Sequence, residues 1–357
     1  MAWQHARRVL AVRLDAMGDV VMTGPAIRAL AGSRGAPQGA GSTEARSVTL
    51  LTSPAGAEAG SLLPGVDDVI CYEAPWMKAS QPRTGSADLA MAGCLRQGCF
   101  DAAVIFTVYS QSPLPAALLC HLAGIPLRLA HCRENPYQLL TDWLPEPEPE
   151  ALLRHEVRRQ LDLVGSAGFR VADERLSLEI PAAASQRTLS VLAELAAGPV
   201  VVVHPGASAP SRRWPAGRFA AVARRLSEES GCQIVFTGSS GERELVEDVR
   251  SAMGAPSRSV AGSLDLAELA ALLARADLLV ANNTGPVHVA AAVGTPVVDL
   301  YALTNPQHTP WMVPCRVLSH DVACRWCYKS VCPEGHHRCL RLVDAGEAYQ
   351  AACELLL

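Results

Sequence analysis

Short apolar runs alternate with helix-length segments along the chain. The first run, from Arg8 to Leu14, precedes a turn around Gly18 and a helix expected from about Thr23 to Ala31. Three more runs with strand character follow at residues 48–53, 68–72 and 102–108. Because strands that alternate with helix-length connections form parallel sheets, this half is expected to be an α/β domain.

The same order of elements restarts at Val200, where an apolar strand runs into a turn at Gly206. Phe219, Val222 and Leu226 then recur at helical spacing, so the helix after Pro215 is expected to bury that stripe. The rest of this half is expected to hold strands at 233–237, 277–281 and 295–301, and helices at 242–253, 266–274 and 286–293.

A chain of 357 residues exceeds what one hydrophobic core usually supports. We therefore predict two Rossmann-like domains, residues 1–183 and 184–357, with the boundary between Pro181 and Arg187. The Gly/Ser/Pro-rich stretch from Gly32 to Ser47 is expected to be a flexible loop. The segment from Pro145 to Glu150, in which Pro and Glu alternate, is expected to be a stiff acidic connector at the surface.

Composition excludes several classes of protein. Hydrophobic residues make up 49% of the chain and charged residues 18%, which is typical of a globular protein and not of a disordered one. A formal net charge of -4 gives no general attraction to nucleic acid. The N-terminal residues lack the apolar core of a signal peptide, and no run of about 18 apolar residues is present. We expect a cytoplasmic protein, at most peripheral at the inner face of the plasma membrane.

The segment from Asn282 to His288 carries the strongest chemical signal. An apolar strand runs into polar residues, then a Gly turn, then a helix that starts near Pro286. Exposed amides and the positive end of the dipole at such a helix start favour an anion such as a diphosphate. Thr284 and His288 would add donors. The alternative is that Asn282, Asn283 and Thr284 only cap the helix.

Two carboxylates follow the first strand, in the segment from Arg13 to Val20. Gly18 allows a ligand to approach the backbone, and Asp19 is the candidate general base. The alternative is that Asp19 is a helix N-cap and Asp15 a solvated loop residue. The chain lacks the G-x-G-x-x-G fingerprint of dinucleotide binding.

A third polar segment, from His204 to Pro215, follows the first strand of the second half. Its adjacent cations, Arg212 and Arg213, would neutralise a departing phosphate.

Twelve cysteines are present, and eight of them lie in apparent strands and helices, where Cys acts as a small buried hydrophobe. The other four have the spacing C-x2-C-x4-C-x6-C. Cys324, Cys327, Cys332 and Cys339 would suit a tetrahedral Zn or an iron centre. Paired disulfides or free thiols are the alternatives, and a structural role fits each case.

These segments together resemble glycosyltransferase family 9, which includes the bacterial lipopolysaccharide heptosyltransferases. The resemblance is carried by residues 17–20, 204–206, 212–215 and 283–288, by Phe236 to Gly238 with Glu242, and by the cysteine-rich tail. It implies a GT-B fold, in which parallel sheets of two Rossmann-like domains face a central cleft. It also implies inversion at the anomeric carbon without a catalytic metal.

The resemblance implies a role for each matched residue. Asp19 would deprotonate the acceptor hydroxyl in the N-terminal domain, and Arg212 would neutralise the diphosphate. Donor contacts in the C-terminal domain would come from Ser208, Glu242 to the ribose, Leu264 to the base, and Asn283, Thr284, Gly285 and His288.

Two positions depart from the family's usual pattern. Lys usually stands where this chain has Arg212, and Asp is frequent where it has Asn283. The expected reaction is transfer of a heptose, from ADP-heptose, to a glycan, a lipopolysaccharide core or another hydroxyl acceptor. The alternatives are a nucleotide-sugar epimerase or hydrolase on the same fold, and a non-catalytic nucleotide-sugar-binding module.

Overall fold

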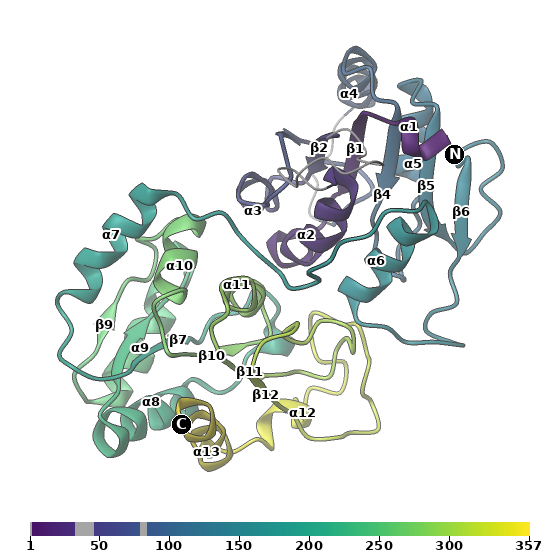
Figure 1. The fold of residues 1–357 in the computed structure, drawn as a ribbon. Helices are drawn as coiled ribbons and strands as arrows, with labels where there is room; N and C mark the ends of the chain where they lie inside the picture. The colour runs from purple at the N-terminus through teal and green to yellow at the C-terminus, as the bar shows by residue number, and fades with distance from the viewer. Residues whose placement is uncertain (1, 33–45, 79–83) are drawn as a thin grey trace. The chain divides into compact units, whose positions relative to one another are not determined.

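The computed structural model describes residues 2–32, 46–78 and 84–357, and the chain divides into two compact units, Met1–Ser177 and Leu178–Leu357. Each unit contains its own sheet, as Figure 1 shows. The loop predicted from Gly32 to Ser47 lies almost entirely outside the described residues. Within the described part, no helix combines the length and the apolar character needed to cross a bilayer.

The sheet of unit 1 has six parallel strands in the order β3-β2-β1-β4-β5-β6. Its strands are β1 (Arg8–Arg13), β2 (Ser47–Thr52), β3 (Asp68–Cys71), β4 (Ala102–Ile105), β5 (Leu127–Cys132) and β6 (Asp142–Pro145). Its helices are α1 (Ala2–His5), α2 (Met17–Ala31), α3 (Ala57–Ser61), α4 (Ser86–Gln97), α5 (Leu114–Leu122) and α6 (Glu156–Ser166).

Unit 2 repeats this topology, with six parallel strands in the order β12-β11-β10-β7-β8-β9. Its strands are β7 (Val200–His204), β8 (Gln233–Phe236), β9 (Arg258–Ser259), β10 (Leu278–Asn282), β11 (Val297–Leu300) and β12 (Cys315–Leu318). Its helices are α7 (Ala182–Leu192), η1 (Pro210–Arg212), α8 (Ala216–Ser230), η2 (Ser240–Glu242), α9 (Arg243–Met253), α10 (Leu266–Leu273), α11 (Gly285–Val293), α12 (Arg338–Arg341) and α13 (Ala345–Leu356).

Both sheets have the doubly wound strand order, so the direction of winding reverses beside the first strand of each. In such sheets ligands bind beyond the carboxyl ends of the strands at the reversal. In unit 1 these are the ends of β1 and β4, and in unit 2 those of β7 and β10.

Each unit has a hydrophobic core of its own. Leu51, Ile105 and Leu95 belong to a buried cluster in unit 1. In unit 2, Phe219, Val222 and Leu226 are all buried in one cluster, which confirms the stripe predicted for α8.

The start of α2 was predicted wrongly. The helix begins at Met17, so Gly18 and Asp19 lie in its first turn and not in a loop before it. Its N-cap position is Ala16, and no side chain caps it there. The alternative role of Asp19 as an N-cap is therefore wrong.

The division between the units lies a few residues before the predicted boundary. Residues 178–181 lead directly into α7, which is held against α10. Arg187 Nη1 lies 2.7 Å from Glu268 Oε1, and Thr188 Oγ1 donates to the Glu268 carbonyl at 3.3 Å. The chain from Leu178 onward accordingly belongs to unit 2.

Two expectations about burial were also wrong. The Pro/Glu segment is not a solvated connector, because Glu146 is 3% exposed and Glu148 is fully buried, with Arg154 Nε 2.7 Å from Glu148 Oε1. Among the eight scattered cysteines, Cys71, Cys94 and Cys99 are exposed. Arg154 and Arg159 hold Glu148 and Glu146 inward, whereas Glu150 is exposed.

Candidate functional site

A buried arginine at the end of β1 gathers three carboxylates. The Arg13 guanidinium is fully buried, and Nε lies 3.0 Å from Asp15 Oδ2, Nη2 3.1 Å from Asp19 Oδ1, and Nη1 2.9 Å from Glu156 Oε1. Gln160 Nε2 also donates to Glu156 Oε1 at 2.9 Å. The cluster therefore ties β1, the first turn of α2 and the start of α6 together.

The cluster shifts the pKa of its members in opposite ways. Burial alone would lower the pKa of Arg13, but the charges of Asp15, Glu156 and Asp19 outweigh it and raise that pKa. Burial raises the pKa of Asp15, Arg13 opposes that rise, and the charge of Asp19 adds to it. Asp15 is thus a buried member of the cluster and not the solvated loop residue of the alternative interpretation.

A cavity of about 760 Å³ opens above this cluster at the reversal point of the unit 1 sheet. Asp15 and Asp19 line it, with Ser53 after β2 and Gln111 after β4. Gln111 Nε2 donates to Asp15 Oδ1 at 2.7 Å, and Ser53 Oγ donates to the Asp15 carbonyl at 2.6 Å.

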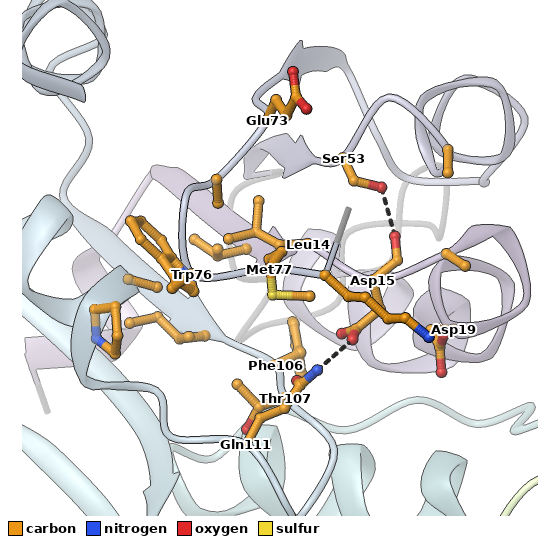
Figure 2. Close-up of a pocket in the computed structure, with 18 of the residues that line it drawn as sticks. Leu14, Asp15, Asp19, Ser53, Glu73, Trp76, Met77, Phe106, Thr107 and Gln111 are labelled. Atoms are coloured by element: carbon orange, nitrogen blue, oxygen red, sulfur yellow. Dashed lines mark hydrogen bonds between the residues drawn. The ribbon is translucent and has the colours of Figure 1, made fainter. Parts of the chain in front are cut away.

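Most of the remaining wall is apolar, and includes Leu14, Trp76, Met77 and Phe106. Figure 2 shows Trp76 on the far side of the cavity from Asp19. Asp19 is 20% exposed, so one carboxylate of the cluster reaches the space that a ligand would occupy.

In unit 2, the end of β10 and the start of α11 form the phosphate-binding candidate. Thr284 is the N-cap residue, but its Oγ1 donates to the Asn282 carbonyl at 3.2 Å and no side chain caps the helix. Asn282 instead joins neighbouring loops, since its Oδ1 accepts from Trp214 N–H at 2.9 Å and its Nδ2 donates to the Pro205 carbonyl at 2.8 Å. The side-chain capping alternative is therefore wrong. Pro286 has no N–H and the Val287 N–H donates to the Thr284 carbonyl at 3.1 Å, so in the first turn of α11 the Gly285 N–H is the amide left for a ligand anion.

Asn283 is hydrogen-bonded to a buried carboxyl, that of Asp299, which was not among the predicted residues. Its Nδ2 donates to Asp299 Oδ2 at 3.1 Å and to the His308 carbonyl at 2.9 Å. Burial raises the pKa of Asp299 to about 8, against the opposing effects of Asn283 and Arg212. His288 is 4% exposed, and its ring centroid lies 6.4 Å from that of His308.

The loop after β7 carries Ser208, which is exposed, and Arg212, which is partly buried. Arg213 Nε donates to the Ala207 carbonyl at 2.8 Å. The Arg212 guanidinium has no hydrogen bond or ion pair to any residue that the structure describes, yet it acts electrostatically on Asp299 and Tyr301. It is thus a cation near the end of β11 whose charge is available to a ligand.

Glu242 ends the 3-10 turn η2 and lies against the end of β7. Its Oε2 accepts from the N–H and the Oγ of Ser239, both at 2.8 Å, and lies 3.9 Å from His204 Nε2. Burial alone would raise the pKa of Glu242, but Ser239 and His204 lower it overall. A Cβ on Gly206 would lie 2.2 Å from Glu242 Oε1, so a larger residue at position 206 would displace the Glu242 carboxylate. Leu264, partly buried, lies two residues after Gly262.

The cysteine-rich tail surrounds one small cavity. About 20 Å³ in volume, it is lined by Cys324, Cys327, Cys332 and Cys339, with His336 and His337. Cys324 Sγ lies 3.8 Å from His336 Nε2, while His336 Nδ1 accepts from the Arg338 N–H at 3.0 Å. All four thiols are free. In the described ranges no three His, Cys, Asp or Glu side chains lie close enough to share a metal ion.

The predicted residues fall into two groups. Gly18 and Asp19 belong to unit 1, and all the other predicted residues belong to unit 2. Arg13, Glu156 and Asp299 were missed as partners of the predicted residues. The available signal was a charged residue inside an apolar strand, as Arg13 stands after Val9 to Val12 and Asp299 after Val297 and Val298.

Comparison with known proteins identifies the family. Residues 90–337 match the model of glycosyltransferase family 9 (heptosyltransferase). The chain is 28% identical over 260 residues to lipopolysaccharide heptosyltransferase 2 of Escherichia coli. The aligned region covers 69% of this chain and 72% of that protein. It is 34% identical over 117 residues to lipooligosaccharide heptosyltransferase 2 of Haemophilus influenzae, and this aligned region covers 31% of this chain and 34% of that protein.

Solved structures confirm the GT-B fold. The family 9 glycosyl transferase of Veillonella parvula has a TM-score of 0.77 at 21% identity, over 98% of this chain and 97% of that chain. For E. coli ADP-heptose lipopolysaccharide heptosyltransferase II the TM-score is 0.74 at 23% identity, over 98% of each chain. The iron-containing dodecameric glycosyltransferase TibC from enterotoxigenic E. coli gives 0.54 at 13% identity, over 98% of this chain and 76% of that chain. This chain therefore belongs to glycosyltransferase family 9, the heptosyltransferase family, and is a glycosyltransferase.

Proposed function

We propose that the protein transfers a heptose from a nucleoside diphosphate sugar, ADP-heptose, to a hydroxyl acceptor with inversion at the anomeric carbon. The main support for this proposal is the cavity of about 760 Å³ in unit 1, because the Asp19 carboxylate lines it beside an apolar wall. Membership of an enzyme family speaks against the non-catalytic binding module. A solved E. coli heptosyltransferase, WaaC, holds ADP-2-deoxy-2-fluoro heptose, which supports the choice of donor.

In this proposal Asp19 is the general base. It would take the proton of the acceptor hydroxyl as that oxygen attacks the anomeric carbon. The 3.1 Å contact with Arg13 Nη2 fixes the direction of the carboxylate and keeps a cation beside it. Asp15 is less suited to this task, since its Oδ1 already accepts from Gln111 and its side chain is 11% exposed against 20% for Asp19. Gly18, in the same helical turn, would leave room for the acceptor.

The donor would bind in unit 2. The N-terminal end of α11, with Thr284, Gly285 and His288, would hold the diphosphate, and Arg212 would neutralise the charge that develops as it leaves. Ser208 would add a hydroxyl, and Asn283 would face the sugar. Glu242 would accept from the ribose through Oε1, since Oε2 is used by Ser239, and Leu264 would line the base pocket.

Because Arg212 and the α11 amides supply positive charge, the transfer would need no metal. A Zn or Fe ion held by Cys324, Cys327, Cys332 and Cys339 would be structural and would take no direct part in the chemical step. We further propose that the enzyme acts in the cytoplasm, with at most peripheral contact with the inner face of the plasma membrane. The exposed free thiols of Cys71, Cys94 and Cys99 suit a reducing compartment.

The test is acceptor-dependent release of ADP from ADP-heptose, with Asp19→Asn compared with Asp15→Asn. Loss of the base should lower turnover by about 10²- to 10⁴-fold while ADP affinity is kept. Asp15→Asn should have a much smaller effect. Full turnover in Asp19→Asn would remove Asp19 as the base. Product formed without any acceptor would point to the epimerase or hydrolase alternative.

A further inference from the structure

The loop that carries Arg212 is tied to the cysteine-rich segment, which we define as residues 322–339. Ser211, the residue before Arg212, is 4% exposed. Its N–H donates to the Ser330 carbonyl at 3.0 Å, and its Oγ donates to the Lys329 carbonyl at 2.7 Å. Both hydrogen-bond donors of this buried residue therefore bond to the cysteine-rich segment.

That segment is in turn held by the loop that follows β11. The Trp326 N–H donates to the Leu303 carbonyl at 2.7 Å, and the Tyr328 N–H donates to the Thr304 carbonyl at 2.9 Å. The cysteine-rich segment thus bridges the loops after β7 and β11, at the carboxyl edge of the sheet where the donor is proposed to bind.

The thiols pack at the junction. Ser211, Leu303 and Thr304 line the same cavity of about 20 Å³ as the four cysteines of the tail. A space of that size holds about one water molecule, so little room is left between the segment and the two loops. The bridge is a packed structure and not a pair of isolated hydrogen bonds.

Arg212 depends on this anchor. Its guanidinium makes no hydrogen bond or ion pair within the described part of the chain, so no polar contact of the side chain there fixes its place. The backbone of the short turn η1 therefore sets the direction in which the Arg212 side chain leaves the chain. Within η1, Ser211 is the residue that is hydrogen-bonded to a segment outside this loop.

We propose that the cysteine-rich segment positions Arg212 for the donor diphosphate, through the two hydrogen bonds of Ser211. The inference rests on the proposed role of Arg212 in the function above. Ser211 is a positioning residue, because it acts through its neighbour and touches no substrate. The cysteine-rich segment then belongs to the donor site and is more than a closing element of unit 2.

The test compares ADP with AMP, because AMP keeps the base and the ribose but lacks the terminal phosphate. Affinities are measured by calorimetry for the full-length protein, Ser211→Ala, Arg212→Ala and the double variant. Ser211→Ala should weaken ADP binding by roughly three- to tenfold and leave AMP binding nearly unchanged. In the Arg212→Ala background, Ser211→Ala should have no further effect, since the group it positions is gone.

Ser190→Ala is the matched control, because the Ser190 Oγ donates to the Arg187 carbonyl within the exposed face of α7. Equal loss of ADP and AMP affinity in Ser211→Ala would overturn the inference, since it would show general damage to the unit. The inference would also be overturned if Ser211→Ala kept its ADP affinity while Arg212→Ala clearly lost it. If Arg212→Ala itself leaves ADP affinity unchanged, the proposed role of Arg212 fails and the inference falls with it.

Discussion

The Asn283 amide lies between two acceptors, the Asp299 carboxyl and the His308 carbonyl. Both protons of its Nδ2 are used by these two contacts, so only the carbonyl oxygen is left for a ligand. Towards a sugar, Asn283 is therefore an acceptor, as an aspartate would be. The departure from the family's frequent Asp changes the charge at this position while keeping the direction of hydrogen bonding.

Asn283→Asp, which restores the family's frequent residue, should be harmful in this chain. A carboxylate would then face the His308 carbonyl with no proton between them, and the proton that Asp299 holds at neutral pH would have to be shared between two buried carboxyls. We expect the free energy of unfolding to fall by roughly 3 kcal/mol, as for a buried charge without its partner. The free energy of unfolding is measured by denaturation in urea. Adding Asp299→Asn should recover most of the loss, because the new amide donates to the carboxylate introduced at position 283; a double variant as unstable as Asn283→Asp would contradict this account.

The raised pKa of Asp299 also predicts how stability depends on pH. Its pKa is about 8 in the folded protein and near 3.8 when solvated, so between these values the folded state binds a proton that the unfolded state does not. Stability should therefore fall as the pH rises from about 4 to about 8. The slope contributed by Asp299 is at most on the order of 1.4 kcal/mol per pH unit.

Comparison of the natural protein with Asp299→Asn isolates this contribution, since the amide does not titrate. Unfolding in urea at several pH values between 5 and 8 should show the natural protein losing stability relative to the variant. A constant difference across that range would mean that Asp299 is already ionised in the folded state.

Among the elements, α2 shows how the site depends on close packing. The turn after β2 brings Gly56 against it, and a Cβ on Gly56 would lie 2.4 Å from Thr52 Oγ1, 2.7 Å from Val20 Cγ2 and 3.3 Å from the Asp15 carbonyl. The neighbouring residues Ser53 and Ala55 line the cavity. The glycine lets this turn approach both α2 and the segment that leads into it.

Gly56→Ala should push this turn away from α2. We expect a loss of stability of roughly 1–3 kcal/mol from overpacking, and lower turnover because Asp15 and α2 shift. Gly93→Ala, in the middle of α4, is the matched control: among the described residues no atom lies within 4 Å of its added Cβ, so helix propensity should raise stability by about 0.5–1 kcal/mol. Equal effects in urea unfolding would contradict the packing argument.

At this scale the sequence predicts the order of elements well and their contacts poorly. Apolar periodicity located β1, β7 and β10, because each buries a continuous run, and indicated the helices that follow them, although it placed the start of α2 six residues late. It could not locate the ion pair between Arg13 and Glu156, which are 143 positions apart in the chain. Nor could it show that Ser211 is bonded to the cysteine-rich tail. Such contacts depend on tertiary packing, and no local pattern encodes them.

For the whole molecule, the duplicated topology has a thermodynamic consequence. Each unit has its own buried cluster, and the proposed base and the proposed donor site belong to different units. A ligand that binds only one unit should raise the stability of that unit by mass action. Damage to the core of the other unit should leave its affinity unchanged.

Leu51→Ala and Phe219→Ala test this separation, because both side chains are fully buried, the first in unit 1 and the second in unit 2. Each cavity should cost about 2–5 kcal/mol in its own unit. Calorimetric unfolding gives the midpoint temperature of each unit's transition. ADP should raise the midpoint of the transition that Phe219→Ala lowers, and should leave the midpoint of the transition that Leu51→Ala lowers unchanged. ADP affinity should be kept in Leu51→Ala. If Leu51→Ala weakens ADP binding as much as Phe219→Ala does, the donor nucleotide is not held by unit 2 alone.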